Sequence, residues 1–194
     1  MPKFAANLTM LFNEVPFLDR FKAAAAAGFR GVEFLFPYAF HRDQIADKLN
    51  QYQLDLVLHN LPAGNWDAGE RGIAIFPERV AEFRDAITYA KALGVKQLNC
   101  LVGKQGADLS TQVAQDTLVG NLRFAADALK AEGIRLLVEP INTYDIPGFF
   151  VNRTKQALEI FDAVGSDNLF LQYDIYHMQI MEGELAKTIE TNLA

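Results

Sequence analysis

The chain has 194 residues, of which 51% are hydrophobic and 22% charged, and its formal net charge is −6. This composition is typical of a soluble globular domain, and the length suits one domain over residues 1–194. A negative net charge argues against nucleic acid as a partner, because nucleic-acid binding needs a basic surface. We also expect no contact with a membrane, because no apolar run is long enough to cross one.

The cysteine content and the N-terminal residues predict the cellular compartment of the protein. Cys100 is the one cysteine, so no disulfide can form within the chain. Residues 1–5 lack the long apolar run of a signal peptide. Both features fit a reducing compartment, and we expect a cytoplasmic protein.

Strand and helix patterns alternate along the chain. Apolar runs bounded by Gly or Pro predict strands at 4–8, 31–36, 54–59, 96–102, 134–139 and 169–174. Amphipathic segments, several of them ended by glycine, predict helices at 15–27, 43–51, 77–93, 110–133, 154–164 and from about 182 onward. This alternation predicts an α/β fold in which a parallel sheet is covered by helices.

Two architectures compete for such a pattern, an open doubly wound sheet and a closed (β/α)8 TIM barrel. The turn after the first expected strand, at 7–12, carries no glycine-rich phosphate loop, which weakens the dinucleotide-binding form of the open sheet. Polar residues end several strands, and in a barrel all strand ends face one pocket. We therefore favour the barrel.

A complete barrel needs eight strand–helix units and about 250 residues. The sequence provides about six units, so we expect a single barrel domain over 1–194 that is incomplete at its C-terminus. The first and sixth strands would then have unpaired edges, which favour association. A homo-oligomer is therefore an open expectation.

Two carboxylates stand where a buried strand gives way to a loop. Glu139 ends the run 134–139 and Asp174 ends the run 169–174. A carboxylate at such a place is costly unless a metal, a partner charge or a substrate compensates it. Neighbouring parallel strands would bring both side chains to one ion, and oxygen ligands suit Mg²⁺ or Mn²⁺. The alternative is a structural ion pair with an arginine or lysine.

Four further residues are candidates for contact with a small anionic substrate. His177 follows Asp174 by three positions and His59 ends the third expected strand, so each is placed to donate to a substrate oxygen. Lys104 and Arg71 lie in loops after strands and are the candidates for binding an anionic substrate, which the negative net charge does not exclude. A loop histidine bonded to backbone, or a solvated surface charge, is the alternative in each case.

Three other side chains have an expected place near this pocket. Glu33 alternates with Val32 and Phe34, so we expect it to point into the barrel, where a buried carboxylate needs a partner. Trp66 and Phe149 are expected either to cover the pocket or to pack within their loops.

Seven ordered blocks resemble a known family, the hydroxypyruvate isomerases among the xylose-isomerase-like (β/α)8 barrels. The resemblance extends over the whole chain. The blocks are FAANL (4–8), HNLPAG (59–64), AGERGIA (68–74), NCLVGK (99–104), EPIN (139–142), DIPGF (145–149) and QYDIYHMQ (172–179).

The resemblance implies an enzyme that interconverts hydroxypyruvate and tartronate semialdehyde. In this family two glutamates move the proton, and a divalent metal is commonly held by a Glu, an Asp, a Gln or His, and a second Glu. Glu139 matches the first glutamate and Asp174 matches the aspartate ligand. The remaining ligands and the second glutamate would lie on later strands, beyond residue 194.

Three other functions stay open at this point. One is a related isomerisation of 2-oxo-tetronates or a ketose 3-epimerisation, which pocket shape decides. Another is cleavage of DNA at abasic sites, which predicts a basic groove and more metal-binding histidines than the three present. The last is a barrel fragment without catalysis.

Overall fold

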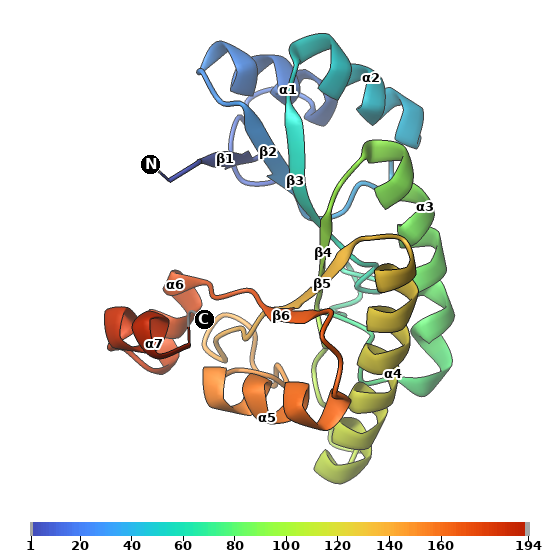
Figure 1. The fold of residues 1–194 in the computed structure, drawn as a ribbon, viewed down its shortest axis with the longest axis vertical. Helices are drawn as coiled ribbons and strands as arrows, with labels where there is room; N and C mark the ends of the chain where they lie inside the picture. Colours follow the sequence, from blue (N-terminus) through green and yellow to red (C-terminus); the bar gives the residue numbers. More distant parts are fainter. Residues whose placement is uncertain (1, 193–194) are drawn as a thin grey trace.

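The computed structural model describes residues 2–192, and there six strands form one parallel sheet. The strands lie in the sheet in the order in which they occur along the chain (Figure 1). Their bounds are β1 Ala5–Asn7, β2 Gly31–Phe34, β3 Asp55–Asn60, β4 Gln97–Cys100, β5 Arg135–Val138 and β6 Leu169–Leu171.

The sequential strand order distinguishes the two architectures that the sequence left open. A doubly wound sheet reverses its strand order at a switch point, whereas a barrel adds each strand beside the previous one. Here every parallel pairing joins consecutive strands, from β1 with β2 to β5 with β6. The barrel-type arrangement is confirmed, and β1 and β6 are the two edges of the sheet formed by residues 2–192.

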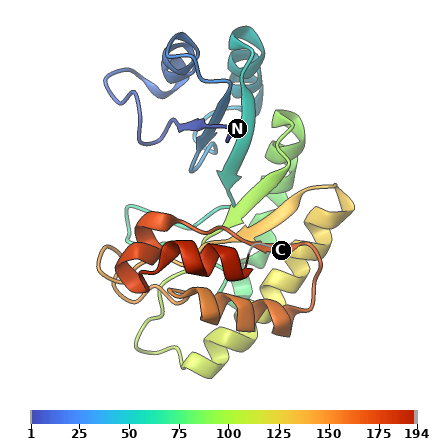
Figure 2. The same cartoon turned by 60° about the vertical axis from the view of Figure 1, so that its left-hand side comes forward.

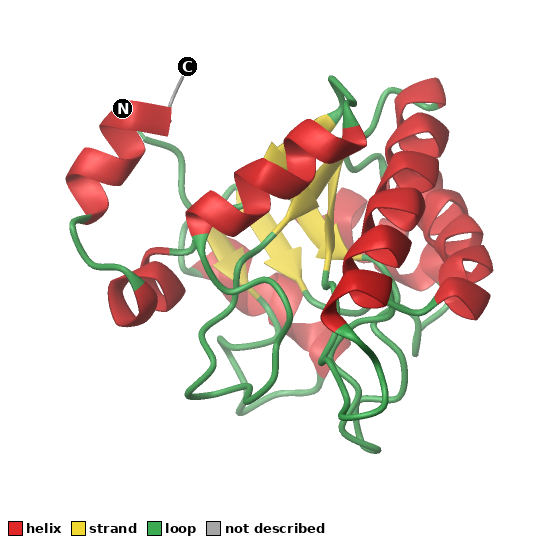
Figure 3. Cartoon of the chain, turned by 90° about the horizontal axis from the view of Figure 1, so that it is seen from below, coloured by secondary structure: helices red, strands yellow, loops and turns green. Residues whose placement is uncertain are grey.

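The connecting helices cover the outer face of the curved sheet (Figures 1 and 3). This follows from right-handed crossovers that all wind in one direction. The helices are α1 Phe17–Ala26, α2 Arg42–Tyr52, α3 Phe83–Leu93, α4 Thr111–Ala131 and α5 Thr154–Val164. None of the helices in residues 2–192 is long and apolar enough to cross a membrane.

The sixth strand ends at Leu171, three residues before Asp174, which was expected to close it. Two helical segments also differ from the expected pattern. The helix expected at 77–93 divides into a 3-10 helix, Pro77–Glu82, and α3. The two parts are continuous because Glu82 at the junction has right-handed helical backbone angles. A helix that the sequence pattern did not predict, α6 (Ile175–Met181), begins after a short connection from β6 and leads to α7 (Leu185–Asn192). Both lie away from α1 and α2, towards the other end of the molecule (Figures 1 and 2).

The main core lies between the sheet and the outer helices. Phe17 and Phe21 of α1 pack against Phe34 of β2, with ring centroids 5.4 and 6.1 Å from Phe34. Such aromatic contacts add to the free energy gained from apolar burial. Apolar side chains thus dominate the helix-facing side of the strands, and most of the polar side chains of the strand ends lie on the inner face.

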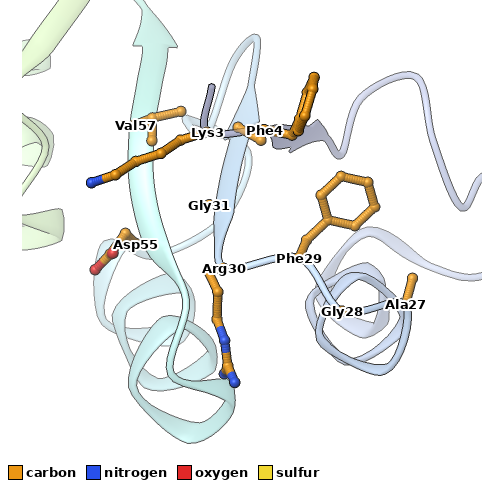
Figure 4. A pocket seen from close by; sticks show the side chains of 10 residues that line it. Lys3, Phe4, Ala27, Gly28, Phe29, Arg30, Gly31, Asp55 and Val57 are labelled. Atoms are coloured by element: carbon orange, nitrogen blue, oxygen red, sulfur yellow. The ribbon is translucent and has the colours of Figure 1, made fainter. Parts of the chain in front are cut away.

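The two ends of the strands have different character. At the amino ends of β1–β3 a broad hollow is bordered by Phe4, Phe29, Arg30, Asp55 and Val57 (Figure 4). The carboxyl ends carry Glu139 and Asp174 instead. Barrel enzymes react at the carboxyl ends of their strands, so the hollow at the amino ends is at the opposite end from the expected chemistry.

The loop between β3 and the 3-10 helix is docked on the end of β4 through Gly72. Gly72 forms an isolated bridge with Val102, and its N–H donates to the Ala63 carbonyl at 2.9 Å. Its φ is +132°, and a Cβ at this position would overlap the Leu101 carbonyl oxygen and lie 2.5 Å from the Gly103 nitrogen. Only glycine therefore allows this close approach.

Substitution of Gly72 should be far more costly than substitution of Gly69 in the same loop. Both glycines have positive φ, but a Cβ on Gly69 would meet no heavy atom within 4 Å. We expect Gly69→Ala to lower the free energy of unfolding by about 1 kcal/mol and Gly72→Ala by about 3 kcal/mol or more. Urea denaturation measures both, and equal losses would contradict the docking described here.

Candidate active site

A cavity of about 420 Å³ opens at the carboxyl ends of the strands, on the inner face of the sheet. Side chains from β1, β2 and β3 line one part of it, and side chains that follow β5 and β6 line the other. Its polar lining consists of Asn7, Glu33, Asn60, Glu139, Gln172, Asp174 and His177. The two carboxylates expected from the sequence therefore share one cavity.

Glu139 is held at the end of β5 by neutral amides. The residue is 8% exposed. Asn99 of β4 donates from Nδ2 to Glu139 Oε2 at 2.9 Å, and the Gln172 side chain lies close enough to lower the pKa of the carboxyl. Burial raises the pKa of Glu139 to about 7, and the nearby Asp174 carboxylate acts in the same direction. The amides oppose this shift because they stabilise the charged form.

The two carboxylate oxygens of Asp174 have different partners: Oδ1 accepts hydrogen bonds from the backbone, and Oδ2 lies near His177. Its side chain caps α6: Oδ1 accepts from the N–H groups of Tyr176 and His177 at 2.7 and 3.3 Å. Aspartate is a preferred residue at this position because it satisfies N–H groups that the helix leaves unbonded. The cap fixes the orientation of the carboxylate, and Oδ2 lies 3.8 Å from His177 Nε2.

His177 lies in the first turn of α6 beside both carboxylates. Ligand atoms of Glu139, Asp174 and His177 all lie within 4.8 Å of one another. The ion pairs that Lys and Arg make within residues 2–192 involve other carboxylates, among them Glu70, Glu82 and Asp167. The structural ion pair that the sequence left open for Glu139 and Asp174 is therefore not formed in the described part of the chain.

The donor atoms around the two carboxylates fit a hard divalent cation. Besides the carboxylates, the carbonyl oxygens of Asn99 and Gln172 are buried and have no hydrogen-bond partner among residues 2–192. An oxygen-rich donor set suits Mg²⁺ or Mn²⁺ better than a metal that prefers sulfur or several imidazoles. Glu139 and Asp174 are the residues that would hold such an ion.

Glu33 points into the same cavity, as its alternation in β2 predicts. Asn7 of β1 supplies its partner, because Asn7 Nδ2 donates to Glu33 Oε1 at 3.0 Å. The two residues are register partners on adjacent strands. Burial is the main cause that raises the pKa of Glu33, and Asp174 contributes in the same direction. A third carboxylate thus adds to the negative charge of the cavity.

The structure corrects the placement expected for His59. Leu58 and Asn60 line the cavity, so His59 between them points to the helix-covered face. There its ring is fully buried, stacked on Phe34 with centroids 6.3 Å apart, and edge-on to Tyr38. It lies outside the cavity that contains Glu139.

Lys104 and Arg71 lie together, but in a small separate hollow that Glu70, Gly72 and Phe76 also border. The Arg71 guanidinium stacks on Trp66, 4.1 Å from the ring centroid, and Trp66 itself lines the main cavity. Contact of Lys104 or Arg71 with a substrate stays a prediction.

Trp66 and Phe149 take different places. Trp66 lines the cavity and is 38% exposed, which fits a covering side chain. Phe149 is 1% exposed and belongs to the core, so the packing alternative is correct for that residue.

Sequence reasoning did not identify the amides that support the site. Asn99 and Gln172 contact Glu139, and Asn142 is 2.8 Å from His177 Nδ1. For Asn99 a signal was available, since an amide within the otherwise apolar run 98–102 needs a partner when buried. For α6 the signal was Asp174 itself, a typical N-cap residue.

Acid should destabilise the protein through His59. Burial lowers the pKa of His59 to about 4, from 6.5. Between these values the unfolded chain binds the proton and the folded chain does not. The contribution of neutral His59 to the free energy of unfolding is therefore complete above pH 6.5 and is lost as the pH falls to about 4. The loss amounts to about 3 kcal/mol.

Denaturant unfolding at pH 7 and pH 4.5 measures this effect. The variant His59→Phe keeps an aromatic ring and removes the titration, so its stability should depend less on pH than that of the wild type. His41→Gln is the control. Because His41 caps α2, the variant is compared only through its change in stability between pH 7 and pH 4.5, which should match that of the wild type. Equal pH dependence in all three proteins would contradict the burial of a neutral His59.

Comparisons with known proteins agree with this geometry. Residues 21–193 match the family model described as xylose isomerase-like TIM barrel. The chain is 56% identical over 193 residues to hydroxypyruvate isomerase of Escherichia coli, a match that covers 97% of this chain and 75% of the relative. It is 45% identical over 198 residues to 2-oxo-tetronate isomerase of Cupriavidus necator, with 100% and 76% covered.

Among solved structures, that of a protein named AP endonuclease, family 2, from Brucella melitensis superposes with a TM-score of 0.94 at 48% identity. That match covers 98% of this chain and 75% of the other. The relatives named above as isomerases are similar over nearly the whole of this chain, and the expected fold and resemblance are both confirmed. The chain belongs to the xylose isomerase-like TIM barrel family, and its relatives there include hydroxypyruvate and 2-oxo-tetronate isomerases.

Proposed function

We propose that this chain belongs to an isomerase that interconverts hydroxypyruvate and tartronate semialdehyde by proton transfer between adjacent carbons. The observation that carries the proposal is the buried Glu139 carboxylate beside Asp174, at the carboxyl ends of the strands. Burial raises the pKa of Glu139 to about 7. The similarity to hydroxypyruvate isomerase, at 56% identity, supports the choice of substrate.

The reaction moves hydrogen within one molecule and leaves its formula unchanged. A proton leaves the hydroxymethyl carbon, and a proton is added to the carbonyl carbon. The hydroxyl proton passes to the oxygen of the former carbonyl. Between loss of the first carbon-bound proton and addition of the second, the two carbons share a double bond and each carries an oxygen, so the intermediate is an enediolate. The difficult step is removal of the carbon-bound proton, which needs a base near it and stabilisation of the negative oxygen.

Glu139 is suited to take that proton. A base works best when its pKa lies near the working pH, and burial brings the pKa of Glu139 into that range. The Asn99 amide and the Gln172 side chain orient its carboxylate without adding a charge. A cation at Asp174 would lower this pKa, so that Glu139 would be ionised at neutral pH but would be a weaker base than it is without the cation.

A divalent cation bound by Glu139 and Asp174 would act as a Lewis acid on the substrate oxygens. Glu139, Asp174 and Glu33 make the cavity acidic, so an anionic substrate would otherwise be repelled. We propose Mg²⁺ or Mn²⁺ on the basis of the oxygen-rich donor set. His177 would donate a hydrogen bond to a substrate oxygen, and Trp66 would cover the cavity.

Two related functions are weighed against this one. The 2-oxo-tetronate isomerases are similar at 45% identity, and a comparison of kcat/KM for hydroxypyruvate and a 2-oxo-tetronate decides between the substrates. The similar protein from Brucella melitensis carries the name of an AP endonuclease. A net charge of −6 and a single histidine in the cluster do not favour cleavage of DNA by this chain.

Replacement of Glu139 tests the proposal directly. Glu139→Gln keeps an oxygen that accepts from Asn99 and removes the ability to accept a proton. We expect kcat for hydroxypyruvate to fall by about 10³-fold, measured in a coupled assay with added Mn²⁺ on a version extended by the later strands that the resemblance implies. The thermal unfolding midpoint should be unchanged or raised, because a buried carboxylate has been neutralised.

Glu159→Gln is the matched control, because Glu159 is exposed on α5 and pairs with Lys155 at 3.7 Å. That variant should turn over as the wild type does. If Glu139→Gln retained turnover within twofold of the wild type, Glu139 would have no role in proton transfer.

A further inference from the structure

We infer that Asn142 is a positioning residue that holds His177 in the tautomer with its proton on Nε2. His177 then presents an N–H donor towards Asp174 and the cavity, and its lone pair faces Asn142. The inference rests on the proposed function only for its effect on turnover. The tautomer itself is a property of the folded chain and is tested without substrate.

The orientation of the Asn142 amide is fixed by two backbone groups. The N–H groups of Tyr144 and Asp145 lie 3.0 and 2.8 Å from Asn142 Oδ1. An N–H group can donate only to an oxygen here, so the amide nitrogen must occupy the other position. That nitrogen lies 2.9 Å from Asp145 Oδ2, an acceptor, which agrees with this assignment.

The same nitrogen determines which ring nitrogen of His177 carries the proton. Asn142 Nδ2 lies 2.8 Å from His177 Nδ1. Nδ2 has two hydrogens and no acceptor capacity: one hydrogen serves Asp145 and the other points at His177. Nδ1 must therefore offer its lone pair, and in a neutral imidazole the proton is then on Nε2.

A second set of contacts makes this arrangement rigid. Asp145 Oδ2 also accepts from the Tyr176 hydroxyl at 2.8 Å, so the loop after β5 and the first turn of α6 are joined through one carboxylate. Asn142 is fully buried. A turn at this place needs only the oxygen of an Asx side chain, which aspartate supplies equally well. The donor half of the amide is used for Asp145 and His177.

This tautomer separates the roles of the three groups that lie within 4.8 Å of one another. Nε2 of His177 is 3.8 Å from Oδ2 of Asp174, and an N–H at that position cannot bind a metal. The protein ligands of a cation would then be oxygens, and His177 would contact a substrate oxygen.

The test uses Asn142→Asp, which keeps the oxygen required by the backbone of the turn and replaces the donor that faces both His177 and Asp145 with an acceptor. Long-range ¹H–¹⁵N correlation spectra of the full chain at pH 8, without metal or substrate, report protonation at each ring nitrogen of His177. In the wild type we expect an unprotonated Nδ1 and a protonated Nε2. In the variant Nδ1 should move to the chemical-shift region of a protonated nitrogen. Asn50→Asp makes the same change at an exposed position and should leave the spectrum of His177 unaltered.

Two results would overturn the inference: a wild-type His177 with its proton on Nδ1, or a folded Asn142→Asp protein in which Nδ1 remains unprotonated. The first needs no variant, so the inference stays testable if Asn142→Asp does not fold. In the hydroxypyruvate assay kcat of Asn142→Asp should fall by about tenfold or more, as for other residues that orient a ligand through hydrogen bonds. Absence of turnover in the wild type would count against the proposed function and not against the tautomer.

Discussion

The site depends on two carboxylates that adjacent parallel strands force together. β5 and β6 pair in parallel, so their carboxyl ends lie side by side. Glu139 and Asp174, which follow these strands, are therefore close together at the carboxyl end of the sheet. Their repulsion adds to burial in raising the pKa of Glu139, and Asp174 cannot turn away because its Oδ1 caps α6. A proton or a cation is what relieves such a pair.

The groups around the pair supply hydrogen bonds without supplying positive charge. Asn99, Gln172 and Asn142 are neutral amides that orient Glu139 and His177. The expected cations, Lys104 and Arg71, border another hollow. A site arranged in this way keeps its negative charge uncompensated by side chains in the described part of the chain, and that is the environment in which a divalent ion binds and a carboxylate acts as a base.

The sequence predicted the order of elements and the two carboxylates because strand ends leave a clear signal, an apolar run closed by an acidic residue. It misplaced His59 because it took that residue as the end of the third strand, whereas β3 continues to Asn60. Successive residues of a strand point to opposite faces, so Asn60 faces the cavity and His59 faces the helices. It did not find Gln172 and Asn142 because both lie outside the strands, in segments without periodicity. Asn99 needs a partner within its apolar run, but the sequence does not say that the partner is Glu139. The long loops that carry Lys104 and Arg71 have no periodicity, so their docking could not be predicted.

The most direct test of the paired-carboxylate site is a crystal structure of the protein with Mn²⁺, in which anomalous scattering locates the ion. We expect a peak about 2.1 Å from a carboxylate oxygen of both Glu139 and Asp174, with His177 outside bonding distance. A peak at another place, or Glu139 and Asp174 bound instead to arginine or lysine side chains, would contradict a shared cation site.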